Sequence, residues 1–108
     1  MKLLSSSQID RLQQQYIFGC NLDRQDAVVK IYDPCGPGTW YLLNQNPESP
    51  DCLWAIVRNI YVEVKIVSLL ELEAYRGKPM GLPLDRDPYF MQMRAMDLWE
   101  KIWTGKHI

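Results

Sequence analysis

The segment of residues 68–90 constrains the backbone more than any other part of the sequence. It opens on Ser68-Leu-Leu-Glu71, a capping-box pattern whose serine and glutamate side chains satisfy N–H groups at the start of a helix. Gly77 follows at a position where a left-handed residue commonly ends a helix. Three prolines and one more glycine occur before residue 89. We therefore expect a short capped helix followed by an irregular segment.

Four stretches ahead of this segment are typical of β-strands. They are residues 27–33, 39–43, 53–58 and 61–67. In the last one, valine and isoleucine at even positions alternate with tyrosine, glutamate and lysine, which predicts one buried and one wetted face. The turn Pro-Cys-Gly-Pro-Gly at residues 34–38 joins the first two strands, and Arg58-Asn59 joins the last two. The four strands therefore form two antiparallel hairpins.

Helical spacing occurs near both ends of the chain. Ser7 is the expected cap of a first helix that runs to about Tyr16. Residues 93–103 return to helical spacing, with one apolar stripe and a second beside it. The first stripe is Met96, Trp99 and Trp103; the second is Ala95, Leu98 and Ile102. The sequence predicts an α+β domain over residues 1–108, in which a small antiparallel sheet of about four strands packs with three helices.

Length, charge and cysteine content limit the functional classes. The 108 residues fit one compact domain, and 13 acidic against 12 basic residues give a formal charge of −1. A nucleic-acid binder usually carries a basic stripe and a DNA mimic an acidic excess, and neither occurs here. The N-terminal apolar run is too short for a signal peptide, and no segment has the roughly 20 apolar residues of a membrane helix. Cys20, Cys35 and Cys52 are odd in number and form no C-x-x-C pair, which does not fit the disulfide framework of a secreted protein. The expected location is therefore the cytoplasm.

The residues usually needed for catalysis or cofactor binding are sparse. The single histidine, His107, lies one residue from the C-terminus and is a poor candidate for a positioned general base. A zinc site built from this histidine and the three cysteines would lack the close ligand pairs of structural zinc sites. Gly36-Pro37-Gly38 opens a strand rather than a helix, unlike a phosphate-binding loop. We expect no enzymatic activity, no cofactor and no metal.

Asp85-Arg86-Asp87, with the neighbouring Tyr89, is the charged cluster best suited to a ligand site. In an extended segment the two carboxylates project to one side and the guanidinium to the other. A functional interpretation makes the carboxylates a metal or acid–base pair and Arg86 an anion clamp. A structural interpretation has an Asp accept nearby backbone N–H groups while Arg86 pairs with a glutamate or a carbonyl. We favour the structural one, because no second cluster completes a site.

Aromatic residues offer two candidate binding surfaces. Four of them lie on expected strands and could stack nucleic-acid bases: Trp40, Tyr41, Trp54 and Tyr61. Basic residues among them are few, so core or partner contacts are favoured over nucleic-acid binding. In the C-terminal helix, Met96, Trp99 and Trp103 either close the core, which we favour, or dock on a protein partner or a second copy of the chain.

Several motifs of this chain occur together in one family. They are Tyr32-Asp33-Pro34, Thr39-Trp40-Tyr41, residues 72–77, residues 81–87 and Tyr89-Phe90. In these motifs the sequence resembles small bacterial proteins catalogued as domain of unknown function 2958, which are often carried on plasmids, phages and other mobile elements. The resemblance extends to about Phe90, and the tail after Met91 looks like an addition. It implies an accessory protein that meets host machinery, with no catalytic residues to carry over.

Three functions follow from these observations. The leading one is a non-enzymatic accessory protein that binds a host or defence protein and modulates or inhibits it. The second is a nucleic-acid-binding accessory protein that uses the sheet face. The third is a small ligand-binder or enzyme centred on Asp85, Arg86 and Asp87.

Overall fold

The computed structural model describes residues 2–105, so His107 lies outside the described residues. The helices are α1 (Ser6–Gln14), α2 (Leu69–Ala74) and α3 (Ala95–Trp103), with short 3-10 turns η1 (Tyr16–Phe18) and η2 (Leu22–Arg24). The longer strands are β2 (Val29–Tyr32), β3 (Thr39–Gln45), β4 (Cys52–Arg58) and β5 (Val62–Ser68). Short strands are β1 (Asp26–Ala27), β6 (Arg76–Gly77), β7 (Leu82–Pro83), β8 (Asp85–Arg86) and β9 (Met93–Arg94). No helix in residues 2–105 is long and apolar enough to cross a membrane.

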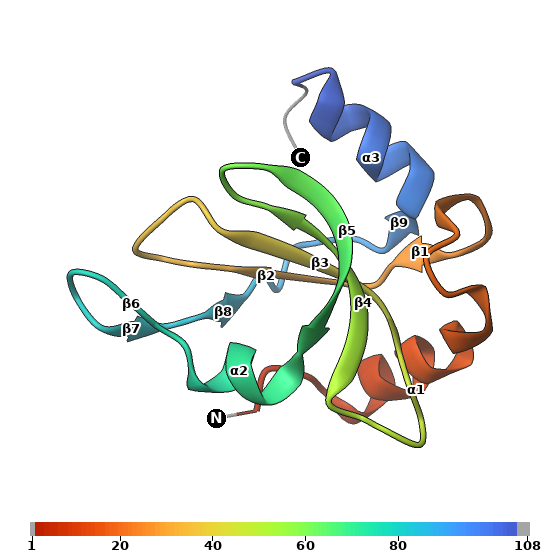
Figure 1. The fold of residues 1–108 in the computed structure, drawn as a ribbon, viewed down its shortest axis with the longest axis horizontal. Coiled ribbons are helices and arrows are strands. Elements are labelled where there is room, and N and C mark those ends of the chain that lie inside the picture. Colours follow the sequence, from red (N-terminus) through yellow and green to blue (C-terminus); the bar gives the residue numbers. More distant parts are fainter. Residues whose placement is uncertain (1, 106–108) are drawn as a thin grey trace.

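The main sheet has five antiparallel strands in the order β5-β4-β3-β2-β8 (Figure 1). Both predicted hairpins are present, since β2 pairs with β3 and β4 pairs with β5. The fifth strand, β8, was not expected, because its two residues belong to the charged cluster that we took for an irregular segment. The α+β class with an antiparallel sheet and three helices is confirmed.

Helices cover both faces of this sheet (Figure 1). On one face, α1 and α2 pack on a core that contains Leu12, Leu42 and Leu72. On the other face, α3 packs on a second core that contains Ile56 and Leu98. The central strands β3 and β4 are consequently buried on both sides, which explains their nearly continuous apolar sequences.

The predicted alternation of β5 holds only in its first half. Val62 and Val64 are partly buried, whereas Glu63 and Lys65 are exposed. The prediction is wrong at the end of the strand: Ile66 is 54% exposed, and Val67 packs into the core on the α2 side. The difference arises because α2 covers this end of the face that we expected to be wetted.

Ser5, and not Ser7, caps α1. The Ser5 Oγ accepts the Gln8 N–H at 3.3 Å, and the Gln8 Oε1 accepts the Ser5 N–H at 2.9 Å. The prediction of Ser7 is wrong because only a cap at Ser5 places a glutamine three residues later, which completes a capping box.

The prediction that Gly77 ends α2 in a left-handed conformation is also wrong. The helix ends at Ala74, and Tyr75 leaves it with extended backbone angles (φ −59°, ψ 139°). Gly77 instead pairs with Leu82 in the β6–β7 hairpin. A Cβ atom at Gly77 would lie 2.6 Å from the Asp33 Oδ1 atom. Glycine is therefore required here by close packing and not by its φ angle.

A buried glutamine joins the end of α1 to the sheet. The Gln15 Nε2 donates to the carbonyls of Asp26 (2.9 Å) and Leu43 (2.6 Å), and its Oε1 accepts the Asp26 N–H at 2.8 Å. The pairing of β3 with β4 shifts register between Leu42 and Asn44, which places a β-bulge at Leu43. A bulged residue is left unpaired in its ladder, so Gln15 supplies the donor that the strand does not.

Candidate interaction surfaces

The two apolar stripes of α3 have different surroundings. Ala95, Leu98 and Ile102 are buried against the sheet and close the second core. Of the predicted partner-binding stripe, Met96 and Trp99 are partly buried, whereas Trp103 is 61% exposed. The two tryptophan rings meet edge to face with centroids 5.7 Å apart. α3 therefore closes the core with one stripe and leaves an aromatic surface, Met96–Trp99–Trp103, at its margin.

Contacts at the start of α3 hold this surface in place. β9, directly before the helix, pairs with β1, and the Ala95 N–H donates to the Gln25 carbonyl at 2.9 Å. The Arg94 guanidinium binds Asp97 at 2.8 Å and Asp23 at 3.0 Å. The Arg94 hydrogen bond also lowers the pKa of the Asp97 carboxyl. The aromatic surface thus projects from a helix whose position is fixed by backbone pairing.

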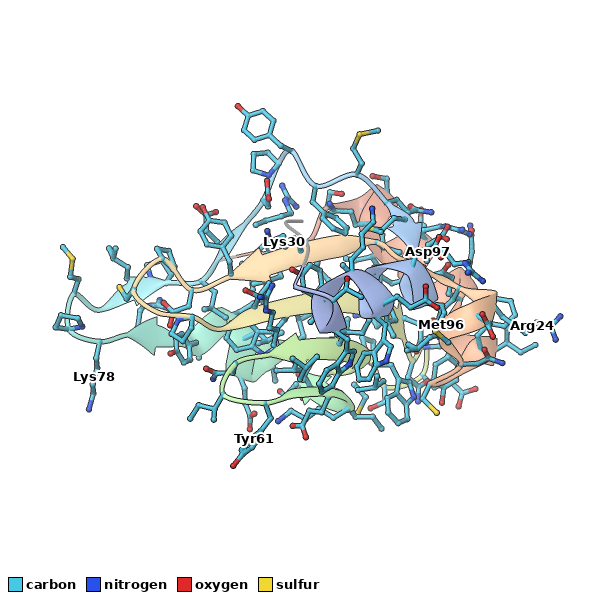
Figure 2. All side chains as sticks on the ribbon, turned by 90° about the horizontal axis from the view of Figure 1, so that it is seen from above. Arg24, Lys30, Tyr61, Lys78, Met96 and Asp97 are labelled. Atoms are coloured by element: carbon cyan, nitrogen blue, oxygen red, sulfur yellow. The ribbon has the colours of Figure 1, made fainter. Side chains whose placement is uncertain are left out.

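The aromatic residues of the sheet do not form one stacking surface. Tyr41 is fully buried, while Trp40 and Trp54 pack partly buried on opposite faces of the sheet. Tyr61 is exposed and projects from the β4–β5 turn (Figure 2). Lys30, one of the few basic residues on these strands, is paired with Asp87 at 3.7 Å. Bases could not stack on these rings in succession, because the rings do not share an accessible face.

The Asp85-Arg86-Asp87 cluster is engaged within the chain. Arg86 donates to the Leu3 carbonyl at 3.0 Å and to the Gln8 Oε1 at 2.8 Å, which ties the N-terminal segment to the edge of the sheet. The Asp87 carboxylate accepts the Tyr89 N–H at 2.8 Å and lies 3.7 Å from the Lys30 Nζ. The Asp85 carboxylate accepts the Arg86 N–H at 2.8 Å. These contacts agree with the structural interpretation. Each Asp accepts a nearby backbone N–H, and Arg86 binds a backbone carbonyl and not a glutamate.

The Tyr89 side chain is 89% exposed, at the opposite edge of the sheet from β5. Among residues 2–105, no three His, Cys, Asp or Glu side chains lie close enough together to hold a metal ion. Cys20, Cys35 and Cys52 are free thiols. In the described part of the chain, no third side chain of these types therefore joins Asp85 and Asp87.

Asp33 forms a buried polar centre that the sequence did not single out. One carboxylate oxygen accepts the Cys35 N–H at 2.8 Å, and the other accepts the Tyr75 hydroxyl at 2.9 Å. The hydrogen bond to Asp33 raises the pKa of Tyr75. The Tyr75 ring also packs against Trp40, with centroids 6.1 Å apart. The signals in the sequence were the motif Tyr32-Asp33-Pro34 and the position of Asp33 directly before the turn at residues 34–38, since Asp commonly caps its own turn.

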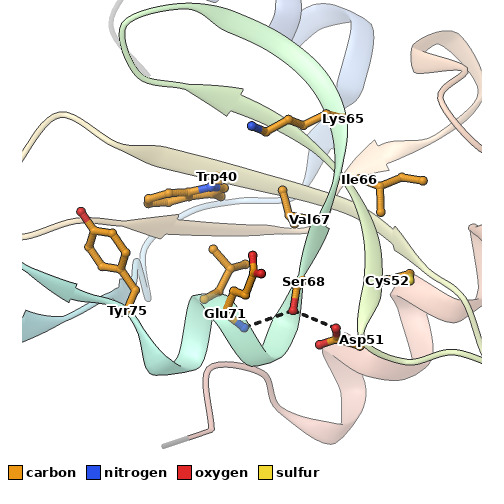
Figure 3. Close-up of a pocket in the computed structure, with 10 residues that line it drawn as sticks. Trp40, Asp51, Cys52, Lys65, Ile66, Val67, Ser68, Glu71 and Tyr75 are labelled. Carbon is orange, nitrogen blue, oxygen red and sulfur yellow. Dashed lines mark hydrogen bonds between the residues drawn. The ribbon is translucent and has the colours of Figure 1, made fainter.

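A groove lies between β5 and α2 on the same side of the molecule as Tyr75 (Figure 3). Its volume is about 430 Å³. The lining combines aromatic, apolar and charged side chains: Trp40, Asp51, Cys52, Lys65, Ile66, Val67, Ser68, Glu71, Leu72 and Tyr75. The groove is open to solvent and its charges belong to both signs, so its composition alone does not select a ligand class.

Asp51, on the rim of this groove, completes the cap of α2. The Ser68 Oγ accepts the Glu71 N–H at 3.1 Å, as the capping box predicts, and donates to Asp51 at 2.8 Å (Figure 3). The other oxygen of Asp51 accepts the Leu70 N–H at 2.7 Å. We expected the Glu71 side chain to accept an N–H group at the start of this helix. A carboxylate distant in sequence, Asp51, accepts one instead.

These bonds stabilise the protein only while Asp51 is ionised, so the contribution of Asp51 to stability falls in acid. The Leu70 N–H, followed by the Ser68 hydroxyl, holds the pKa of Asp51 below its ordinary 3.8. A lowered pKa stabilises the fold above the unfolded-state value, and this stabilisation is lost as the pH falls through the folded-state value. Asp51→Asn should therefore destabilise the protein more at about pH 6 than at about pH 2.5 in urea unfolding. Equal losses at both pH values would contradict the role of the charge.

The fold and these surfaces define a small α+β protein whose sheet is covered on both sides and whose last helix carries an exposed tryptophan. The chain belongs to the family described as Protein of unknown function (DUF2958), whose model matches residues 3–106. The resemblance seen in the sequence motifs is thereby confirmed. The match also includes α3, so the suggestion that the tail after Met91 is an addition is wrong. No curated protein and no solved structure matches the chain.

Proposed function

We propose that this protein acts without catalysis, by binding another protein through the Met96–Trp99–Trp103 surface of α3. The observation that carries the proposal is Trp103, which is 61% exposed, whereas the other large apolar side chains of α3 are buried or partly buried. Exposed tryptophan beside partly buried apolar residues is a common composition of binding hot spots.

The state of the other candidate site supports the same proposal. All three charged residues of the cluster, Asp85, Arg86 and Asp87, form hydrogen bonds within the chain. These structural contacts explain the residues without a ligand. The sheet aromatics also lack a common accessible face, which disfavours the nucleic-acid alternative.

The biological setting is part of the proposal and rests on the family resemblance. We place the protein in the cytoplasm as an accessory product of a plasmid or phage that modulates or inhibits a host or defence protein. The free thiols of Cys20, Cys35 and Cys52 are compatible with a reducing compartment.

A matched pair of variants tests the surface. Deleting α3 would expose the second core, so the test uses Trp103→Ala and, as control, Tyr89→Ala, which removes an exposed aromatic ring close to the edge strand β8. Proteins captured from the native host by the wild-type chain are identified and their affinities measured. Trp103→Ala should weaken binding about tenfold or more with little change in melting temperature, while Tyr89→Ala should bind normally. Partners retained equally by both variants would refute the assigned surface.

A further inference from the structure

The outer edge of β5 is a long unpaired edge of the main sheet. β5 pairs with β4 on one side, and no strand in residues 2–105 pairs with its other side. The strand contains seven residues, with no proline, and its register with β4 is unbroken. Proteins usually shorten, bend or cover such an edge, because its free N–H and C=O groups can pair with another chain.

Hydrogen bonds at the two ends of the β4–β5 ladder show which backbone groups face outward. The Leu69 N–H donates to the Asp51 carbonyl at one end, and the Asn59 N–H donates to the Tyr61 carbonyl at the other, both at 2.9 Å. Hydrogen-bonded and non-hydrogen-bonded pairs alternate along an antiparallel ladder. The odd-numbered residues of β5 therefore bond to β4. Val62, Val64 and Ile66 direct their N–H and C=O groups toward the open edge.

The charges of β5 select one register for pairing with a second β5. When Val64 lies opposite Val64 of the second copy, Glu63 lies opposite Lys65 of that copy, and two-fold symmetry repeats the pair. Two neighbouring registers also pair the outward-facing N–H and C=O groups of the two strands. One places Glu63 opposite Glu63 of the second copy, and the other places Lys65 opposite Lys65. Like charges directly opposite each other destabilise a strand pair. The sequence of β5 is thus complementary to itself in the register centred on Val64.

We propose that this protein forms a symmetric dimer in which two β5 strands pair antiparallel about Val64. Each Glu63–Lys65 pair then occupies a non-hydrogen-bonded position, where side chains of facing strands approach most closely. In the single chain these two side chains are 53% and 52% exposed and bind each other at 3.2 Å, so the dimer would exchange this surface ion pair for pairs across the interface. The exposed Ile66 would lie opposite Val62 of the second copy and lose contact with water.

This dimer goes beyond the proposed partner binding and does not depend on it. Antiparallel neighbours are related by an axis perpendicular to the sheet, so corresponding faces of the two copies lie on the same side. Both α3 helices, which cover one face of the sheet, would therefore lie on that side. A dimer would present the Met96–Trp99–Trp103 surface twice, and paired sites raise avidity for a multivalent partner.

Charge reversal tests the pairing in the full chain by sedimentation equilibrium between about 5 and 500 µM. The wild type should show a dimer that dissociates on dilution. Glu63→Lys and Lys65→Glu each oppose like charges twice per dimer and should weaken dimerisation about tenfold or more. The double variant restores opposite charges and should regain most of the affinity. Glu48→Lys and Lys78→Glu, matched changes at exposed positions outside β5, should have no effect.

Amide hydrogen exchange gives a second readout on the unmodified protein. Exchange at Val62, Val64 and Ile66 should slow as the protein concentration rises, since only their N–H groups gain partners in the dimer. A monomer at all concentrations would overturn the proposal. The proposal would also be overturned by a dimer whose affinity is unchanged by both single charge reversals and whose β5 amides gain no protection from exchange. Such a dimer would use another surface, such as α3. Neither result bears on the affinity loss expected for Trp103→Ala.

Discussion

Gly77→Ala is expected to lower the free energy of unfolding by about 2–4 kcal/mol, through overpacking and the loss of an Asp33 hydrogen bond. The added methyl group would lie 2.6 Å from the Asp33 Oδ1 and 2.9 Å from the Cys35 Cβ. Neither neighbour can move freely, because the Cys35 N–H and the Tyr75 hydroxyl both bind the Asp33 carboxylate. Urea unfolding of the purified variant measures the loss.

Gly81→Ala is the matched control for this substitution. Gly81 has a φ angle of +68° and open space where a Cβ atom would stand, so alanine there is strained without colliding. Its cost should be about 1 kcal/mol. Replacing Asp33 by Ala removes the atom that the Gly77→Ala methyl meets, so the double variant should be less destabilised than the two single losses together. A loss below about 0.5 kcal/mol for Gly77→Ala would contradict the close-packing explanation.

Gln15→Leu is expected to cost about 2–4 kcal/mol, although leucine fits a buried position well in size. The substitution leaves the Asp26 N–H and the carbonyls of Asp26 and Leu43 without the amide that now pairs with them. Unpaired buried polar groups cost far more than a typical hydrogen bond contributes, because they lose water and gain nothing in return. Thermal and urea unfolding measure the effect.

The neighbouring Gln14→Leu is the control, since the Gln14 side chain is exposed. It should change stability by no more than about 0.5 kcal/mol. Gln15→Glu separates donation from acceptance: it can still accept the Asp26 N–H, but it cannot donate to the two carbonyls when ionised. It should destabilise the protein at least as much as Gln15→Leu. Similar stabilities for the Gln14 and Gln15 leucine variants would show that the bulge at Leu43 does not need this donor.

The elements predicted correctly are those whose pattern is local. The strands around the Pro-Cys-Gly-Pro-Gly turn and the alternating first half of β5 were recognisable because strand propensity and turn residues occur within a few positions of each other. The helices were recognisable for the same reason, although Ser7 was preferred to Ser5 as the first cap. The complete capping box from Ser5 to Gln8 is the stronger of the two local signals.

The features missed involve partners far apart along the chain. Asp85 and Arg86 form a strand only because the free edge of β2 is available to them, and two charged residues have little strand propensity of their own. Asp51 caps α2 from 19 positions away, and Asp33 binds Tyr75 across 42 positions. No local pattern predicts such contacts, because their geometry exists only after the sheet has formed.

Local sequence patterns were enough to predict the α+β class, the two hairpins, the helix capped by Ser68 and the family. The roles of residues 68–90 could be assigned only from the folded chain. Gly77 packs on Asp33, Arg86 holds the N-terminal segment, and the charged cluster closes one edge of the sheet while β5 leaves the other edge open. Secondary structure follows short-range backbone and side-chain preferences, whereas burial and edge pairing depend on which elements the folded chain brings together.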